Sequence, residues 1–105
     1  MAAVRSLDER GRMVSRWRRR RMCMLVAGCP APAALREVSA IGAFVETSAR
    51  PPLGSTVELH HPEAGAISGH VRAAAHDGLV LAFTCSERSV AFALAAIAAD
   101  MTRPA

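Results

Sequence analysis

The stretch that decides the fold is LREVSAIGAFVET, residues 35–47, in which two short apolar runs flank the turn sequence Ser39-Ala40-Ile41-Gly42. The hydroxyl of Ser39 can hydrogen-bond the backbone of a tight turn. Gly42 permits either a positive φ or the close approach of another group to bare backbone. The stretch therefore predicts a β-hairpin with strands at 35–39 and 43–47, and it leaves both roles of Gly42 open.

Strand patterns continue on both sides of this hairpin. An apolar run at 22–27 predicts a first strand, and Gly28, Pro30 and Pro32 after it predict that this strand ends at residue 27. Apolar and polar residues alternate at 56–60, and residues 67, 69, 71, 73 and 75 fall on one face of a predicted half-buried strand. Asp77-Gly78 is a strong hairpin signal before a last strand at 79–83.

The period changes near the C-terminus, where Val90, Leu94, Ile97 and Met101 follow the spacing of one stripe of an α-helix. Ser86 is the predicted N-cap, with Glu87 in the first turn. Phe92 lies on the side opposite the stripe. Because a helix that is apolar all round is usually buried on both sides, the pattern predicts a homodimer contact through Phe92 or, second, a contact with a partner domain.

Together these elements predict a mainly β fold, a six-stranded antiparallel β-barrel with a C-terminal α-helix. The length of 105 residues suits one domain. Residues 1–15 show no sustained period and are expected to form a flexible tail, so the barrel domain is predicted at 16–103.

The basic charge of the chain is concentrated at its N-terminus. Residues 1–21 contain eight arginines and two acidic residues, whereas the remainder contains five arginines and seven acidic residues. The chain has no lysine. Since the guanidinium fork suits phosphates and guanine edges, this arm is a candidate anion-binding segment. A solubilising tail, a nonspecific polyanion binder and the codon usage of a GC-rich genome remain alternative explanations.

Other functional classes find little support in the sequence. Cys23, Cys29 and Cys85 lack C-x-x-C spacing, and the four histidines lack ligand spacing, so we expect neither disulfides nor a metal site. No motif pairs a nucleophile with a base, so an enzyme is not expected. Residues 18–29 imitate a twin-arginine or lipoprotein signal with a short apolar part, but no stretch is long enough to span a membrane, and we expect a cytoplasmic location.

The arrangement of an arginine pair, Arg16 and Arg20, before a strand and a turn with the pattern Glu37-x-Ser39-x-x-Gly42 resembles the PilZ domain family. The resemblance covers the order of elements from residue 16 to about residue 101. It implies binding of cyclic di-GMP without a further cofactor, with the arginine pair and the turn residues as ligand contacts. It also implies that binding orders the arm across the barrel and passes a second-messenger signal to a protein partner.

Two details leave alternatives open within this resemblance. The spacing of the pair also fits Arg12 with Arg16, and Arg19 and Arg21 are possible additional contacts. Glu37 stands where the family has Asp or Asn, which places its carboxylate one methylene farther from the backbone. A degenerate PilZ-like adaptor that no longer binds nucleotide is therefore the alternative prediction.

Overall fold

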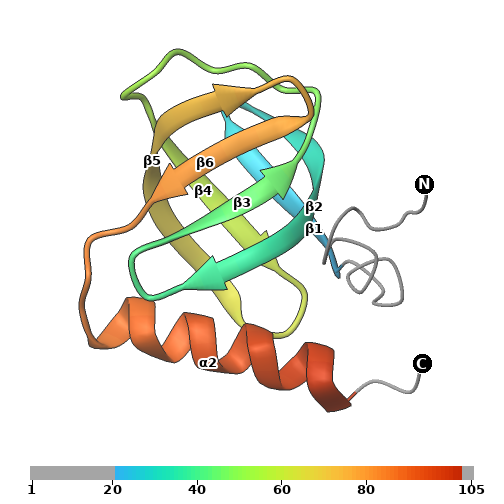
Figure 1. Ribbon diagram of the computed structural model, residues 1–105, viewed down its shortest axis with the longest axis vertical. Helices are drawn as coiled ribbons and strands as arrows, with labels where there is room; N and C mark the ends of the chain where they lie inside the picture. Colours follow the sequence, from blue (N-terminus) through green and yellow to red (C-terminus); the bar gives the residue numbers. More distant parts are fainter. Residues whose placement is uncertain (1–20, 103–105) are drawn as a thin grey trace, which may run out of the picture.

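The computed structural model describes the backbone of residues 21–102 and the side chains of residues 21–100. Six antiparallel strands form a closed barrel in the order β1-β2-β3-β6-β5-β4, and one helix lies across an end of it (Figure 1). This confirms the predicted mainly β barrel with a C-terminal helix. Residues 1–20 and 103–105 lie outside the described part. The elements are β1 (Arg21–Ala27), β2 (Cys29–Ser39), β3 (Gly42–Glu46), β4 (Thr56–His61), β5 (Gly65–Ala75), β6 (Gly78–Ala82) and α2 (Glu87–Thr102).

The barrel interior is filled by alternate residues of every strand, as the period of two predicts. In β4, Val57 and Leu59 are buried while their neighbours in sequence are exposed. In β6 and just beyond it, the predicted set Leu79, Leu81 and Phe83 is buried. The largest core side chains that are less than 2% exposed are Leu25, Val45, Val57, Leu59, Val71, Leu79 and Leu81.

Strand β2 begins six residues earlier than predicted, because Pro30 and Pro32 lie within it rather than in a loop. Gly28, with a φ of 92°, makes the turn from β1. Strand β3 pairs with β2 only from Ala34 onward, so on that side of β2 the prolines have no neighbouring strand. Proline lacks an amide hydrogen, and such an edge tolerates it.

In β5, exposed and buried residues alternate as predicted only as far as Val71. Beyond it the register with β6 shifts, because Val71 pairs with Leu81 while Ala73 pairs with Val80. Arg72 is therefore an extra residue, a β-bulge, and Ala73 becomes exposed. The prediction that Ala73 belongs to the buried face was wrong for this reason.

The start of α2 agrees with the predicted N-cap. The backbone amide of Ser89 donates to the hydroxyl of Ser86 at 3.3 Å, and the amide of Ser86 donates to the hydroxyl of Ser89 at 2.9 Å. These reciprocal bonds satisfy amides at the helix start, in the manner of a capping box. Ser89 is 1% exposed, so this start is fixed against the barrel.

The predicted orientation of α2 was wrong. Phe92 is buried, with its ring centroid 5.9 Å from that of Phe83 in an edge-to-face arrangement. Three small residues, Ala93, Ala96 and Ala99, are buried with it. Alanines let the helix backbone approach the end of the barrel, and a single phenylalanine fills the remaining space. Phe92 is therefore a core residue and is not available for the homodimer contact predicted through it.

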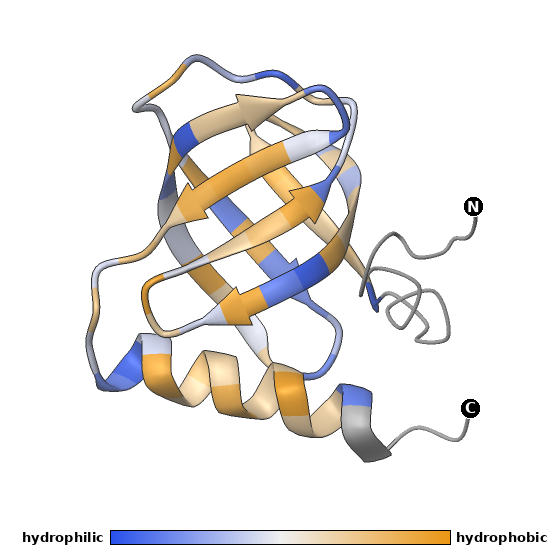
Figure 2. Ribbon diagram, viewed as in Figure 1, coloured by the Kyte–Doolittle hydropathy of each residue, from blue (hydrophilic) through white to orange (hydrophobic). Residues whose placement is uncertain are grey.

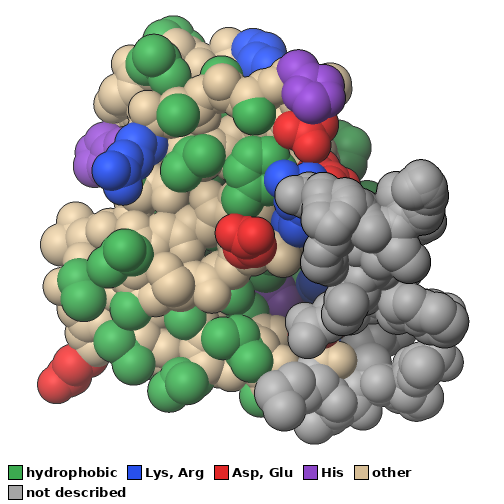
Figure 3. Space-filling model, viewed as in Figure 1, with side chains coloured by type: hydrophobic (Ala, Val, Ile, Leu, Met, Phe, Trp, Pro, Cys, Tyr) green, Lys and Arg blue, Asp and Glu red, His purple; other side chains and the backbone are tan. Residues whose placement is uncertain are grey.

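The large aliphatic residues of α2 face away from the barrel instead. Val90, Leu94 and Ile97 are 41%, 63% and 41% exposed. Figure 2 shows α2 in apolar colours along its length with hydrophilic colours near its ends, and Figure 3 shows hydrophobic side chains gathered over it. We call Val90, Leu94 and Ile97 the aliphatic stripe. In the described structure, nothing covers the aliphatic stripe.

Candidate functional site

The turn between β2 and β3 is held by Ser39. The backbone amide of Ile41 donates to the Ser39 hydroxyl oxygen at 3.2 Å, and that hydroxyl lies 3.5 Å from the carbonyl oxygen of Gly42. The first contact is a normal turn bond, whereas the second is too long to be strong. Because Ser39 is exposed, its hydroxyl proton can turn to an acceptor outside the chain at little cost.

Gly42 is required by the barrel itself. A Cβ built on Gly42 would collide with the carbonyl oxygen of Leu81 in the adjacent strand β6. The positive φ values fall at Gly28, Gly54 and Gly65, so Gly42 does not need a left-handed backbone. Of the two roles left open by the sequence, close approach is the one observed, and the approaching group belongs to this chain.

A β-bulge in β2 sets the direction of Glu37. Leu35 pairs with Val45 and Glu37 pairs with Phe44, so Arg36 is an extra residue on β2. In a regular strand Leu35 and Glu37 would share a face. With the bulge, Leu35 is buried in the core while Glu37 is exposed on the outer face.

The two bulges occupy corresponding places on the outer face of the barrel. Strands β3 and β6 lie between β2 and β5 in the sheet order, and the bulge residues are Arg36 on β2 and Arg72 on β5. Both arginines line a single hollow of about 350 Å³. Its wall and floor are formed by Arg36, Glu37, Val38, Ser39, Ile41, Gly42, Ala43, Phe44, Arg72, Val80 and Leu81.

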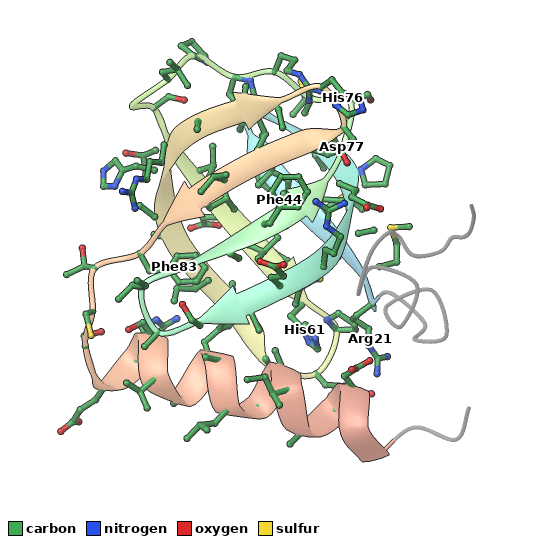
Figure 4. The ribbon with its side chains drawn as sticks, in the orientation of Figure 1. Arg21, Phe44, His61, His76, Asp77 and Phe83 are labelled. Atoms are coloured by element: carbon green, nitrogen blue, oxygen red, sulfur yellow. The ribbon has the colours of Figure 1, made fainter. Side chains whose placement is uncertain are left out.

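The pairing register arranges part of this hollow as one row across four strands. Glu37 pairs with Phe44, Phe44 pairs with Val80, and Val80 pairs with Ala73, which follows Arg72. The partly buried Phe44 and Val80 form an apolar floor, and Figure 4 shows Phe44 on this face of β3. The row therefore has an acidic end, an apolar centre and a basic end.

Arg36 is held within the protein through Nη1 and through its contact with Phe44. Its Nη1 donates to Glu46 Oε2 at 2.7 Å and to Asp77 Oδ2 at 3.2 Å, and its guanidinium carbon lies 4.0 Å from the ring centroid of Phe44. Burial acts to raise the pKa of Asp77, but the hydrogen bond and charge of Arg36 outweigh it, so this pKa is lowered. Arg36 thus fixes one face of the Phe44 ring rather than offering a free guanidinium.

Arg72 and Glu37 are not engaged in this way. Neither side chain has a hydrogen bond or ion pair with any described residue, and both are exposed in the hollow. The carboxylate accepts hydrogen bonds only, and the guanidinium donates only. Together they suit a ligand that carries donors at one edge and acceptors at another.

Arg21 lies elsewhere, at the start of β1. Its Nη2 donates to the carbonyl oxygen of Ala99 in α2 at 3.4 Å and lies 3.6 Å from Glu63 Oε1. Figure 4 shows Arg21 beside His61, close to α2. Arg21 therefore joins the barrel to the helix. It was predicted as a possible additional ligand contact, but it does not line the hollow.

The remaining predicted arginine contacts cannot be placed. Arg12, Arg16, Arg19 and Arg20 lie outside the described residues, so their roles stay predictions. Of the predicted site, the structure brings together Glu37, Ser39 and Gly42. Arg72 and Phe44 were not predicted as site residues. Arg72 falls on the polar face of the predicted alternating strand, so its position in the sequence does not distinguish it from Ser68 or His70.

A metal centre finds no support in the described part of the chain. Among these residues no group of three or more histidine, cysteine or acidic side chains could hold a metal ion. His61, which is buried, uses Nδ1 to accept the backbone amides of Glu63 and Ala64 at 3.0 and 2.9 Å. Nδ1 therefore stabilises the turn between β4 and β5.

Comparison with known proteins gives no relative for this chain. No family model, no curated protein and no solved structure matches it. Within the described residues, no helix has both the length and the apolar character needed to cross a membrane.

Proposed function

We propose that this protein is a PilZ-type receptor that binds cyclic di-GMP and transmits the signal to a protein partner. The observation that carries the proposal is the position of Glu37 and Ser39. Both are exposed at one hollow, on the β2–β3 hairpin of a closed six-stranded barrel with a C-terminal helix. The arginine pair predicted at Arg16 and Arg20 would complete the site from the arm that precedes β1.

The chemistry of these groups fits the proposed ligand. Guanine carries N–H donors on its Watson–Crick edge, which the carboxylate of Glu37 can accept. The Ser39 hydroxyl makes only a long contact with the Gly42 carbonyl oxygen, so it can instead donate a hydrogen bond to a phosphate oxygen. Arginine forks can bind the phosphates in two bonds each or stack on the bases. Ordering of the arm over the barrel is then the change that a partner would detect.

The test is titration calorimetry with cyclic di-GMP on the wild type and on the double variant Arg16→Ala, Arg20→Ala. We expect heat of binding for the wild type and a loss of at least about tenfold in affinity, about 1.4 kcal/mol, for the double variant. No heat for the wild type at high micromolar ligand would overturn the proposal. Arg5→Ala with Arg10→Ala is the control, because it removes the same charge from the arm outside the predicted pair.

A nonspecific polyanion binder makes a different prediction for the same arm. Its affinity for RNA would fall steeply with salt, and RNA would displace cyclic di-GMP. Titration in the presence of excess RNA separates the two functions. Under the proposed function, the affinity for cyclic di-GMP is unchanged by RNA.

A second candidate function is favoured by the aliphatic stripe of α2. Between Arg88 and Asp100 the exposed side of the helix carries only alanine, valine, leucine and isoleucine. An identical face could cover it without leaving any polar side chain unpaired, so a second copy of this chain is a suitable partner. In this function the protein is an adaptor that assembles through α2, with or without nucleotide. Light scattering on the wild type and on Leu94→Glu measures this, and a monomer at all concentrations would exclude self-association.

A further inference from the structure

We infer that Arg72 of β5 is a ligand-binding residue, and that a guanine base binds over Phe44 and Val80 between Glu37 and Arg72. The inference rests on the proposed function and deepens it, because it assigns the place of one base and adds a contact outside the turn motif. It rests on three observations: the uncommitted guanidinium, the row across the strands, and the nature of the floor.

Arg72 differs from the other arginines of the described chain. Arg21 and Arg36 each hold an ion pair, Arg50 donates to four backbone carbonyls, and Arg88 donates to the carbonyl of Ala66. Arg72 alone among these five has neither a hydrogen bond nor an ion pair with a described residue. The protein therefore does not use this side chain to stabilise its own described fold.

Arg72 is the bulge residue of β5. As an extra residue in β5, Arg72 leaves the pairing intact on either side and belongs to the outer face. Bulges often re-aim a side chain beside a functional site. Arg72, at this bulge, lines the hollow that Glu37 and Ser39 also line.

The width of the row suits a base held from two sides. Three strand spacings separate β2 from β5, which is about 14 Å along the sheet at the usual spacing. Side chains that stand outward from these two strands leave room between them for one purine with a hydrogen bond on either side.

Guanine presents the right groups in the right order for this gap. The N1–H and 2-amino groups on its Watson–Crick edge donate hydrogen bonds, which suits the carboxylate of Glu37. Its O6 and N7 atoms accept hydrogen bonds, which suits the fork of Arg72. Its flat faces suit the apolar floor of Phe44 and Val80. Adenine carries an amino group in place of O6, so the two contacts together favour guanine over adenine.

The experiment uses the full chain and two probes. In calorimetry with cyclic di-GMP, Arg72→Ala is expected to bind at least about tenfold more weakly, equivalent to about 1.4 kcal/mol. Arg72→Lys, which keeps the charge but not the fork, should be intermediate. The matched control is Arg88→Ala, which removes the same charge from a surface outside the hollow and should bind like the wild type.

The second probe is GMP, followed by amide chemical shifts in NMR spectra. GMP should shift Phe44, Val80 and Arg72 in the wild type and also in Arg16→Ala with Arg20→Ala, whereas AMP should shift them less. If cyclic di-GMP binds equally well to the wild type and Arg72→Ala, the inference is overturned while the proposed function stands. If cyclic di-GMP does not bind but GMP produces these Arg72-dependent shifts, the proposed function fails and the base site stands. If neither cyclic di-GMP nor GMP binds to the protein, both are overturned.

Discussion

The carbonyl oxygen of Leu81 occupies the space that a Cβ on Gly42 would need. This contact joins β6 to the first residue of β3, directly beside Ser39 and the hollow. The glycine of the turn motif therefore has a structural task whether or not a ligand binds. Its presence alone is not evidence for nucleotide binding.

Gly42→Ala should consequently destabilise the fold. The added methyl group must displace the backbone of β6, and overpacking of this kind costs about 1–3 kcal/mol. Urea unfolding followed by circular dichroism measures the change. Ser68→Ala, at an exposed position of β5, is the control and should change the free energy of unfolding by less than about 0.5 kcal/mol. A Gly42→Ala variant as stable as the control would contradict the contact.

Glu37 gives a prediction on binding rather than on stability. Glu37→Gln replaces one acceptor oxygen with an amino group that opposes the donors of guanine, so cyclic di-GMP should bind about tenfold more weakly. Glu37→Asp keeps the carboxylate and should bind at least as tightly as the wild type. Calorimetry measures both variants, and their unfolding curves should match the wild type because Glu37 has no partner among the described residues. Wild-type affinity in Glu37→Gln would exclude Glu37 from the site.

The orientation of α2 predicts that two nearby hydrophobic residues, Phe92 and Leu94, contribute very differently to the free energy of unfolding. Phe92→Ala should cost about 3–5 kcal/mol, because it leaves a cavity against Phe83 and His61. Leu94→Ala removes an exposed side chain of the aliphatic stripe and should cost less than about 0.5 kcal/mol in the monomer. Urea unfolding of both variants at low protein concentration is the measurement. Equal losses would mean that the helix packs by its other face.

His61 should make stability depend on pH. Burial, and secondly the charge of Arg21, lower its pKa from the ordinary value of 6.5, although Glu63 acts to raise it. A proton is thus bound more readily in the unfolded chain, so stability is full above about pH 6.5 and falls as the pH drops toward the folded-state pKa. Protonation of Nδ1 would also break its bonds from Glu63 and Ala64.

This pH dependence is measured by urea unfolding between about pH 7.5 and pH 5.5. His61→Asn retains an acceptor near the turn amides but cannot titrate, so it should be less stable at neutral pH and less sensitive to acid. His70→Asn, at an exposed position of β5, should keep the wild-type pH dependence. If His61→Asn loses as much stability on acidification as the wild type, His61 is not the responsible group.

The three cysteines should differ in reactivity. Burial raises the pKa of the Cys23 thiol to about 11, against the opposing effects of Arg21 and of a backbone hydrogen bond from Leu35. Cys29 and Cys85 are exposed free thiols. Because the thiolate is the reactive form, a thiol reagent at neutral pH should modify Cys29 and Cys85 quickly and Cys23 only after unfolding. Mass spectrometry of peptides identifies the sites, and rapid labelling of Cys23 in the folded protein would contradict the packing of β1.

The barrel was predictable because most strands carry a period of two that depends only on local sequence. Residues such as Leu79 and Leu81 alternate without interruption, and Ser86 marks the helix start in the expected way. The bulges were not predictable, since an extra residue in one strand is defined only by its partner strand. For the same reason the outward position of Glu37 could be known only from its pairing with Phe44.

The helix face illustrates a second limit of the sequence. The spacing of Val90, Leu94 and Ile97 correctly indicates a helix, and their size suggests burial. The end of the barrel instead accepts a flat row of alanines and one phenylalanine. Which face a helix buries depends on the shape it meets, and that shape is formed by residues far away in the chain.

The two bulges also have a consequence for how such a site can arise or disappear. Each arginine is one residue more than the ladder needs, and pairing is regular again on both sides of it. Deleting Arg72, rather than replacing it, would leave Val71 opposite Leu81 and Ala73 opposite Val80. A single inserted or deleted codon is thus enough to add the basic end of the hollow to this barrel or to remove it, while the core residues keep their places.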